Sequence, residues 1–412
     1  MDTRLISNVL IALASQVLGR GSLIFFGMAV ARFWGAEEFA TFSYVLLTAT
    51  FISVFASAGL APSLGRFIAQ ALIDKSLELR EEIFASGILL AGFLSAITII
   101  LFLIPPALIG LPRSLSTALL ALVALSMLLN AVANALANGA ERFKAAAFAA
   151  LVQAVLLAVG GFVSIAINKY ELIIPSLALS FLIPSLFLMR AMQSTFSELG
   201  IRITKINNKA VLRVLAFATP VMASSLLFSS ALWLCGRTLI STDGENSQFA
   251  QFAMSLHWFS LLLLVPNMVN RVLAPTITRQ AFIKSLKHGK NPVVMSSALS
   301  FVTSLITFGA LAGLADWIVT LYALPPEAKY TLLVCACAAV VASPINSLGN
   351  AMIASRNQTQ WLSLASVWWV VLVAMLFFTS GQGAVGVSIA LLVSYCIHLP
   401  LVFTASRRLE VI

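Results

Sequence analysis

SNVLIALASQVLGRGSLIFFGMAVA, residues 7–31, decides the fold, because this apolar run carries one full charge, Arg20, near its middle. At about 1.5 Å per residue, a helix of this length exceeds the ~30 Å hydrocarbon core of a bilayer. Arg20 then lies near the bilayer centre, where a cation costs about 2.5–3.5 kcal/mol on insertion scales. We therefore expect its side chain to face protein, water or an anionic ligand.

The composition of the whole chain indicates an integral membrane protein. It has 412 residues, a mean hydropathy of +1.00, 60% hydrophobic residues and 10% charged residues, whereas soluble proteins average about 25% charged residues. The first apolar run exceeds the usual 7–15 residues of a signal peptide, and no small-residue cleavage site closes it. The net charge of +10 is compatible with nucleic-acid binding, but no soluble domain is long enough to carry such a site, so no nucleic-acid partner is expected.

The apolar runs of spanning length predict an all-α protein with twelve transmembrane helices. They lie near 7–32, 40–64, 82–105, 115–137, 145–167, 171–191, 211–235, 249–272, 293–315, 329–352, 361–379 and 384–405. With the N-terminus inside, 19 of the 25 Lys and Arg residues fall on the cytoplasmic side and five on the other side, Arg20 being the remaining one. The positive-inside rule therefore places both termini in the cytoplasm.

Two similar halves flank the basic stretch 193–210. Leu60-Ala61-Pro62-Ser63 recurs as Leu273-Ala274-Pro275-Thr276, and Asn130-x3-Asn134-Ala135 recurs as Asn346-x3-Asn350-Ala351, at nearly equal offsets. Because each half has an even number of helices, the repeats are parallel and related by an axis along the membrane normal. We therefore predict a six-helix lobe at 1–192, a cytoplasmic linker at 193–210 and a second six-helix lobe at 211–412, around a central cavity.

Arg20 is the first candidate for a binding residue. Gln16 lies one turn before it on the same helix face, and the flanking Gly19 and Gly21 permit close backbone approach. Almost all of the fifteen Asp and Glu residues lie in loops or at helix ends, which favours a cation lining an aqueous cavity. The alternative is a structural cation paired with a carboxylate or a helix C-terminus.

Further candidates carry both a functional and a structural interpretation. Arg32 and Arg237 mark the outer ends of the first and seventh helices, at a possible cavity mouth. His257 and Arg271 share a face of the eighth helix, although Arg271 can simply snorkel to the interface and His257 can be a hydrogen-bonded interior histidine. Asn130 and Asn134 line one helix face, either as interhelical hydrogen-bonding groups or as cavity lining for a sugar.

Neither an enzyme nor a metal protein is predicted. HExxH, GxSxG, P-loop and paired-carboxylate motifs are absent from the sequence. All four cysteines fall in apolar segments, and Cys335 and Cys337 lie on opposing faces of one helix, poorly placed to share a metal. No cofactor is expected.

Three stretches carry a resemblance to a known family. RFWGAEEFATFSYVLLTATFISVFASAGLAPSLGRFIAQ (32–70), ANGAERFKAAA (137–147) and NAMIASRNQTQWLSL (350–364) resemble the polysaccharide-biosynthesis members of the multidrug/oligosaccharidyl-lipid/polysaccharide (MOP) exporter superfamily. Within it, the twelve-helix Wzx-type flippases for O-antigen and related repeat units are the most similar.

The resemblance implies a function. Such proteins move polyprenyl-diphosphate-linked oligosaccharide from the cytoplasmic to the periplasmic leaflet of the bacterial inner membrane by alternating access. In related lipid flippases, cavity arginines on the first and eighth helices meet the diphosphate, which here corresponds to Arg20 and Arg271. Besides the lipid-linked substrate and membrane lipids, a polysaccharide polymerase and the chain-length machinery are candidate partners.

Two alternatives belong to other classes. A cation-coupled small-molecule or multidrug exporter of the same superfamily would need a carboxylate such as Asp316. A membrane polymerase or ligase would need a large periplasmic loop, and the longest outer connection, around 236–248, is short for that purpose.

Overall fold

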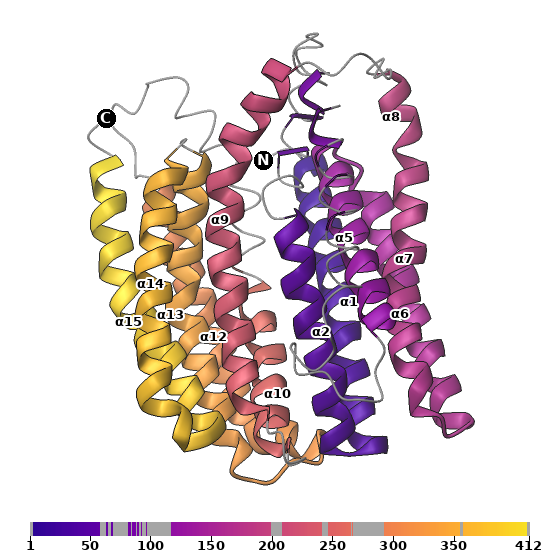
Figure 1. The fold of residues 1–412 in the computed structure, drawn as a ribbon, viewed down its shortest axis with the longest axis vertical. Helices are drawn as coiled ribbons and strands as arrows, with labels where there is room; N and C mark the ends of the chain where they lie inside the picture. Colours follow the sequence, from indigo (N-terminus) through magenta and orange to yellow (C-terminus); the bar gives the residue numbers. More distant parts are fainter. Residues whose placement is uncertain are drawn as a thin grey trace. The chain divides into compact units, whose positions relative to one another are not determined.

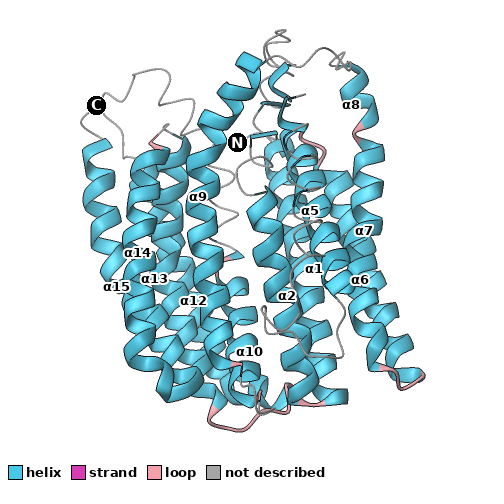
Figure 2. Cartoon of the chain, in the orientation of Figure 1, coloured by secondary structure: helices cyan, strands magenta, loops and turns pink. Residues whose placement is uncertain are grey.

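The helices predicted from the apolar runs are present where the structure describes the chain. The computed structural model describes residues 3–57, 117–198, 208–240, 246–264, 292–354 and 357–409, with scattered positions between 63 and 96 and residue 266. Across these ranges the chain forms helices joined by short turns, without a strand (Figure 2).

The helices shown in Figure 1 agree closely with the prediction. They are α1 (Thr3–Trp34), α2 (Ala36–Ser57), α5 (Thr117–Gly139), α6 (Phe143–Ala166), α7 (Ile173–Ala191), α8 (Gln193–Glu198), α9 (Asn208–Leu239), α10 (Ser247–Leu262), α12 (Pro292–Leu321), α13 (Ala328–Ala354), α14 (Gln358–Thr379) and α15 (Gly383–Leu409), with 3-10 turns η2 (Tyr170–Leu172) and η3 (Ser380–Gln382). The predicted helix 82–105 and the end of 249–272 fall largely outside the described residues, so the count of twelve stays a prediction.

Two elements differ from the prediction. The start of the predicted loop 193–210 forms the short helix α8. The helix predicted to end at residue 315 continues to Leu321, because the residues that follow Asp316 are again mostly apolar.

The bilayer-length apolar runs produce a multi-pass membrane protein. In the described part of the chain, nine helical stretches are long and apolar enough to cross a bilayer, the last of which contains both α14 and α15. Large apolar side chains point outward, as at Phe162, Phe377 and Phe378, which are 72%, 90% and 78% exposed. In water such a surface would be unfavourable, whereas hydrocarbon accepts it.

Gly35 ends the first helix and starts the second. Its backbone has φ +97°, a left-handed conformation that glycine adopts without the steric cost of a Cβ. Its N–H donates to the Ala31 carbonyl, and its own carbonyl accepts from the Phe39 N–H. Residue 35 therefore permits a sharp reversal between α1 and α2.

The chain forms two compact units. Unit 1 comprises 1–26 and 44–230, and unit 2 comprises 27–43 and 231–412. In unit 1, α7 packs against both α5 and α6. In unit 2, α13 packs against α10, α12 and α15, and α14 packs against α15. The predicted lobes 1–192 and 211–412, derived from the sequence repeat, remain a prediction.

Candidate functional site

The arginine of the first helix lies in a polar pocket of unit 1. The pocket has a volume of about 150 Å³ and is lined from four helices. Its lining residues are Ser15, Gln16, Gly19, Arg20 and Leu23 of α1, Asn130 and Asn134 of α5, Ala146, Ala149, Ala150 and Gln153 of α6, and Phe181 of α7. Four of the eight predicted site residues, Arg20, Gln16, Asn130 and Asn134, are thus brought together.

Small side chains create the room for this pocket. Gly19 and three alanines of α6 line it, and a Cβ at residue 19 would lie 3.8 Å from the Gln153 Oε1 atom. Small residues let membrane helices approach closely and leave space for the longer side chains beside them. The pocket therefore combines the long cationic side chain of Arg20 with small residues of α1 and α6 that make space for it.

The two asparagines hold each other in place. The Asn134 Nδ2 atom donates to the Asn130 main-chain carbonyl at 2.8 Å and to the Asn130 Oδ1 atom at 3.0 Å. One turn of α5 thereby fixes the orientation of both carboxamides on the pocket wall. This contact lies within one helix, and both asparagines also line the pocket.

Carboxamides and one guanidinium dominate the chemistry of the pocket. Gln16, Asn130, Asn134 and Gln153 each offer an amide donor and an amide acceptor, and Arg20 contributes a permanent positive charge. None of the described lining residues is acidic. Such a wall favours a negatively charged group that also carries hydrogen-bonding oxygens.

Two buried polar residues of the lining were not predicted from the sequence. Gln153 is 6% exposed and Ser15 is 7% exposed. Gln153 had a detectable signal, because it is the only polar side chain between Ala145 and Val163. Ser15 had none, since serine is common in membrane helices as a backbone-bonded side chain.

The remaining predicted site residues lie elsewhere. Arg32 is exposed in the last turn of α1, and Arg237 is half-buried in the last turn of α9. Both belong to unit 2 and neither lines the pocket of Arg20. Arg271 lies outside the described residues.

His257 lies in a packed aromatic cluster of unit 2. Its Nδ1 atom is 3.4 Å from the Tyr322 hydroxyl, and its ring contacts that of Phe39, with ring centroids 5.8 Å apart. Gly27 allows this packing, because a Cβ there would lie 2.9 Å from the His257 Cε1 atom. These contacts are those of an interior, hydrogen-bonded histidine.

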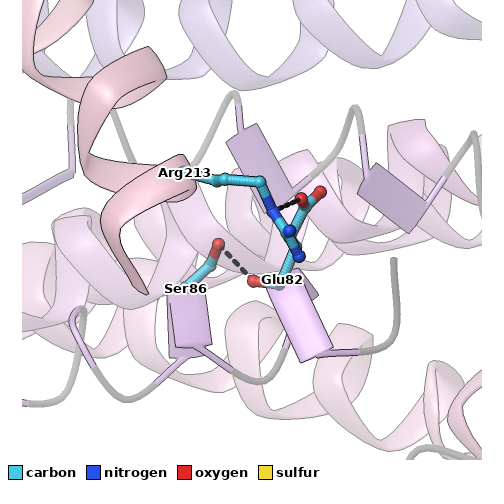
Figure 3. Close-up of polar contacts among 3 residues, drawn as sticks. All are labelled: Glu82, Ser86 and Arg213. Carbon is cyan, nitrogen blue, oxygen red and sulfur yellow. Dashed lines mark hydrogen bonds and ion pairs between the residues drawn. The ribbon is translucent and has the colours of Figure 1, made fainter. Parts of the chain in front are cut away.

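Ion pairs are present elsewhere in the described residues. In unit 1 the Arg213 Nε atom is 2.7 Å from the Glu82 Oε1 atom, and the Ser86 hydroxyl donates to the Glu82 main-chain carbonyl (Figure 3). In unit 2 the Lys329 Nζ atom is 3.1 Å from the Asp316 Oδ1 atom, whose side chain is 80% exposed. Asp316 is thus a surface carboxylate with a partner of its own.

The chain matches a protein family described as "Polysaccharide biosynthesis protein" over residues 5–279. No curated protein sequence matches it.

Its fold is similar to that of several solved transporters. An inward-facing multidrug resistance MATE family transporter of the MOP superfamily has a TM-score of 0.70 at 17% identity, covering 98% of this chain and 99% of that one. A eukaryotic MATE transporter has a TM-score of 0.71 at 12% identity, covering 98% and 95%. A MOP superfamily transporter from Pyrococcus furiosus, described as having a binding pocket of reverse polarity, has a TM-score of 0.72 at 14% identity, covering 98% and 96%. The predicted helical membrane-transporter fold is therefore confirmed.

Proposed function

Because the chain belongs to the polysaccharide biosynthesis protein family and has the fold of MOP-superfamily transporters, we propose that it is a flippase for polyprenyl-diphosphate-linked oligosaccharides. It moves repeat units of O-antigen or a related surface polysaccharide from the cytoplasmic to the periplasmic leaflet by alternating access. The membrane is the bacterial inner membrane, and both chain termini face the cytoplasm. A polysaccharide polymerase and chain-length machinery would receive the product.

The observation that carries this proposal is the position of Arg20 in a pocket walled by carboxamides. A diphosphate presents negatively charged oxygens that a guanidinium binds in bidentate geometry. At 4 Å such a charge pair is worth about 4 kcal/mol at the effective dielectric near a protein surface, against about 1 kcal/mol in water. The amides of Asn130, Asn134 and Gln153 supply further hydrogen bonds to phosphate or sugar oxygens.

The size of the pocket suits the charged part of such a substrate. Its volume of about 150 Å³ is several times the ~30 Å³ that one water molecule takes up in the liquid. A small anionic group fits into that space, whereas a whole oligosaccharide does not. We therefore assign the diphosphate to this pocket, with the sugars and the lipid tail lying outside it.

The experiment that tests the proposal is substitution of Arg20. Arg20→Ala should abolish surface polysaccharide and the translocation of a polyprenyl-diphosphate-linked sugar in proteoliposomes, while the protein still accumulates in the membrane. Arg20→Lys should retain part of the activity, because the charge remains and the bidentate geometry is lost. Arg190→Ala, which removes an exposed arginine from the last turn of α7, is the matched control and should transport normally.

Normal polysaccharide in the Arg20→Ala strain would overturn the assignment. Efflux of cationic compounds by the purified protein would favour the multidrug alternative instead. That alternative needs a carboxylate for the cation, and Asp316, its candidate from the sequence, is an exposed group bound to Lys329.

A further inference from the structure

His398 is a buried histidine to which the proposed flippase function assigns no role. It lies in the middle of α15 and is 1% exposed. Neither its Nδ1 nor its Nε2 atom has a hydrogen-bond partner among the described residues. A neutral imidazole has one donor and one acceptor, and leaving both unsatisfied in a buried site is unfavourable. A buried polar group of this kind in a native structure calls for an explanation.

The surroundings of His398 are aromatic. Its ring centroid is 6.0 Å from that of Trp361 and 6.5 Å from that of Trp368, with interplanar angles of 53° and 52°. Both tryptophans are on α14, and Trp368 also contacts Tyr395 of α15 at 5.1 Å. Indole faces attract cations at about the distance that separates Trp361 from His398. We call Trp361 and Trp368 the aromatic cage.

No carboxylate is available near this cage on the packed helices. The elements in contact with α15 are α10, α13, α14 and η3. Their titratable or charged residues, with those of α15 itself, are His257, Lys329, Tyr330, Cys335, Cys337, Tyr395, Cys396, Arg407 and Arg408. Lys329 is bound to Asp316, Cys335 donates to the Ser388 hydroxyl, and His257 is close to Tyr322. A positive charge on His398 would therefore meet the aromatic cage and no acidic side chain of these elements.

We propose that His398 is a proton-binding site of unit 2, in which the aromatic cage receives the imidazolium and proton binding shifts the packing of α14 against α15. Histidine is the side chain whose charge changes most readily near neutral pH, and ionisable groups inside membrane proteins commonly mark proton pathways. Protonation adds a positive charge to the ring, and the indole faces of α14 attract this charge. It thereby strengthens the contact between α14 and α15, and deprotonation weakens that contact.

Such a site would link transport to a proton gradient. The proton binding itself is independent of the flippase function, whereas the coupling of transport to it rests on that function. The two claims therefore need separate measurements.

Nuclear magnetic resonance of the full chain in lipid nanodiscs tests the proton site. The chain has three histidines, so ¹⁵N-labelled imidazole signals can be assigned with the variants His398→Gln and His257→Gln. We expect the His398 ring nitrogens to change from the neutral to the doubly protonated pattern as the pH is lowered. Trp361→Leu should weaken proton binding, and Trp361→Phe should preserve more of it because a π face remains. A His398 signal that keeps one neutral tautomer at every pH at which the protein stays folded would overturn the proposal.

Proteoliposomes test the coupling. With a polyprenyl-diphosphate-linked sugar as probe, an imposed pH difference should accelerate translocation by the unaltered protein. His398→Gln should lose this acceleration and keep the rate seen without a pH difference, while His257→Gln should keep the acceleration. Acceleration that persists in His398→Gln would overturn the coupling. If the unaltered protein moves no lipid-linked sugar, the flippase proposal fails, and the nitrogen titration still decides whether His398 binds a proton.

Discussion

At the scale of single residues, Gln153 lines the same pocket as Arg20, which the sequence did not predict. It is a buried carboxamide that lines the same pocket from α6. Gln153→Ala should lower kcat/KM for translocation of a polyprenyl-diphosphate-linked sugar by at least about tenfold, because a hydrogen bond to a charged group is worth about 1.5–3 kcal/mol. Gln193→Ala, which alters an exposed glutamine of α8, should leave the rate unchanged. An unaltered rate in Gln153→Ala would remove this residue from the binding site.

At the scale of helices, a glycine sets the approach of α13 to α14. A Cβ on Gly349 would lie 2.5 Å from the Trp361 Cη2 atom, a distance that the fully packed indole cannot easily relieve. Gly349→Ala should therefore lower the stability by about 1–3 kcal/mol, as overpacking typically does. Thermal unfolding in detergent, followed by the fraction of protein that remains soluble and monodisperse, measures this loss.

Gly313 of α12 provides the matched helix control. A Cβ at that position meets no atom within 4 Å, so Gly313→Ala removes only the entropic cost of a helical glycine, about 0.5–1 kcal/mol. Its melting temperature should equal or exceed that of the unaltered protein. Equal losses in the two variants would show that the packing at Trp361 does not limit stability.

At the scale of the whole molecule, the distribution of Lys and Arg predicts the orientation in the membrane. The connection 199–207 belongs to the basic stretch predicted to be cytoplasmic, and the connection 241–245 is predicted to lie on the opposite side. Alkaline phosphatase inserted within 241–245 should be active, because it folds outside the cytoplasm, and should be inactive within 199–207. A fluorescent protein should give the opposite pattern. Phosphatase activity at both positions would contradict the predicted topology.

The sequence by itself determined the membrane class, the family and the positions of the helices that the structure describes. These depend on local properties, because an apolar run of bilayer length must form a helix to satisfy its backbone in lipid. The bounds of α5, α6 and α7 accordingly lie within a few residues of those predicted. Arg20 could also be selected as a candidate from the sequence, since a charge inside such a run is costly wherever the helix packs.

Only the tertiary structure decided what surrounds each buried polar group. Helices in a membrane are apolar on most faces, so their sequences carry little of the amphipathic signal that tells which face meets which neighbour. Arg20 and Asn130 are separated by more than a hundred residues of sequence, yet they line one pocket. Likewise, two histidines of apolar helices look equivalent in the sequence, but packing gives His257 a tyrosine partner and places His398 beside two indole rings. These differences arise from long-range contacts between helices, which residue patterns within a single helix do not specify.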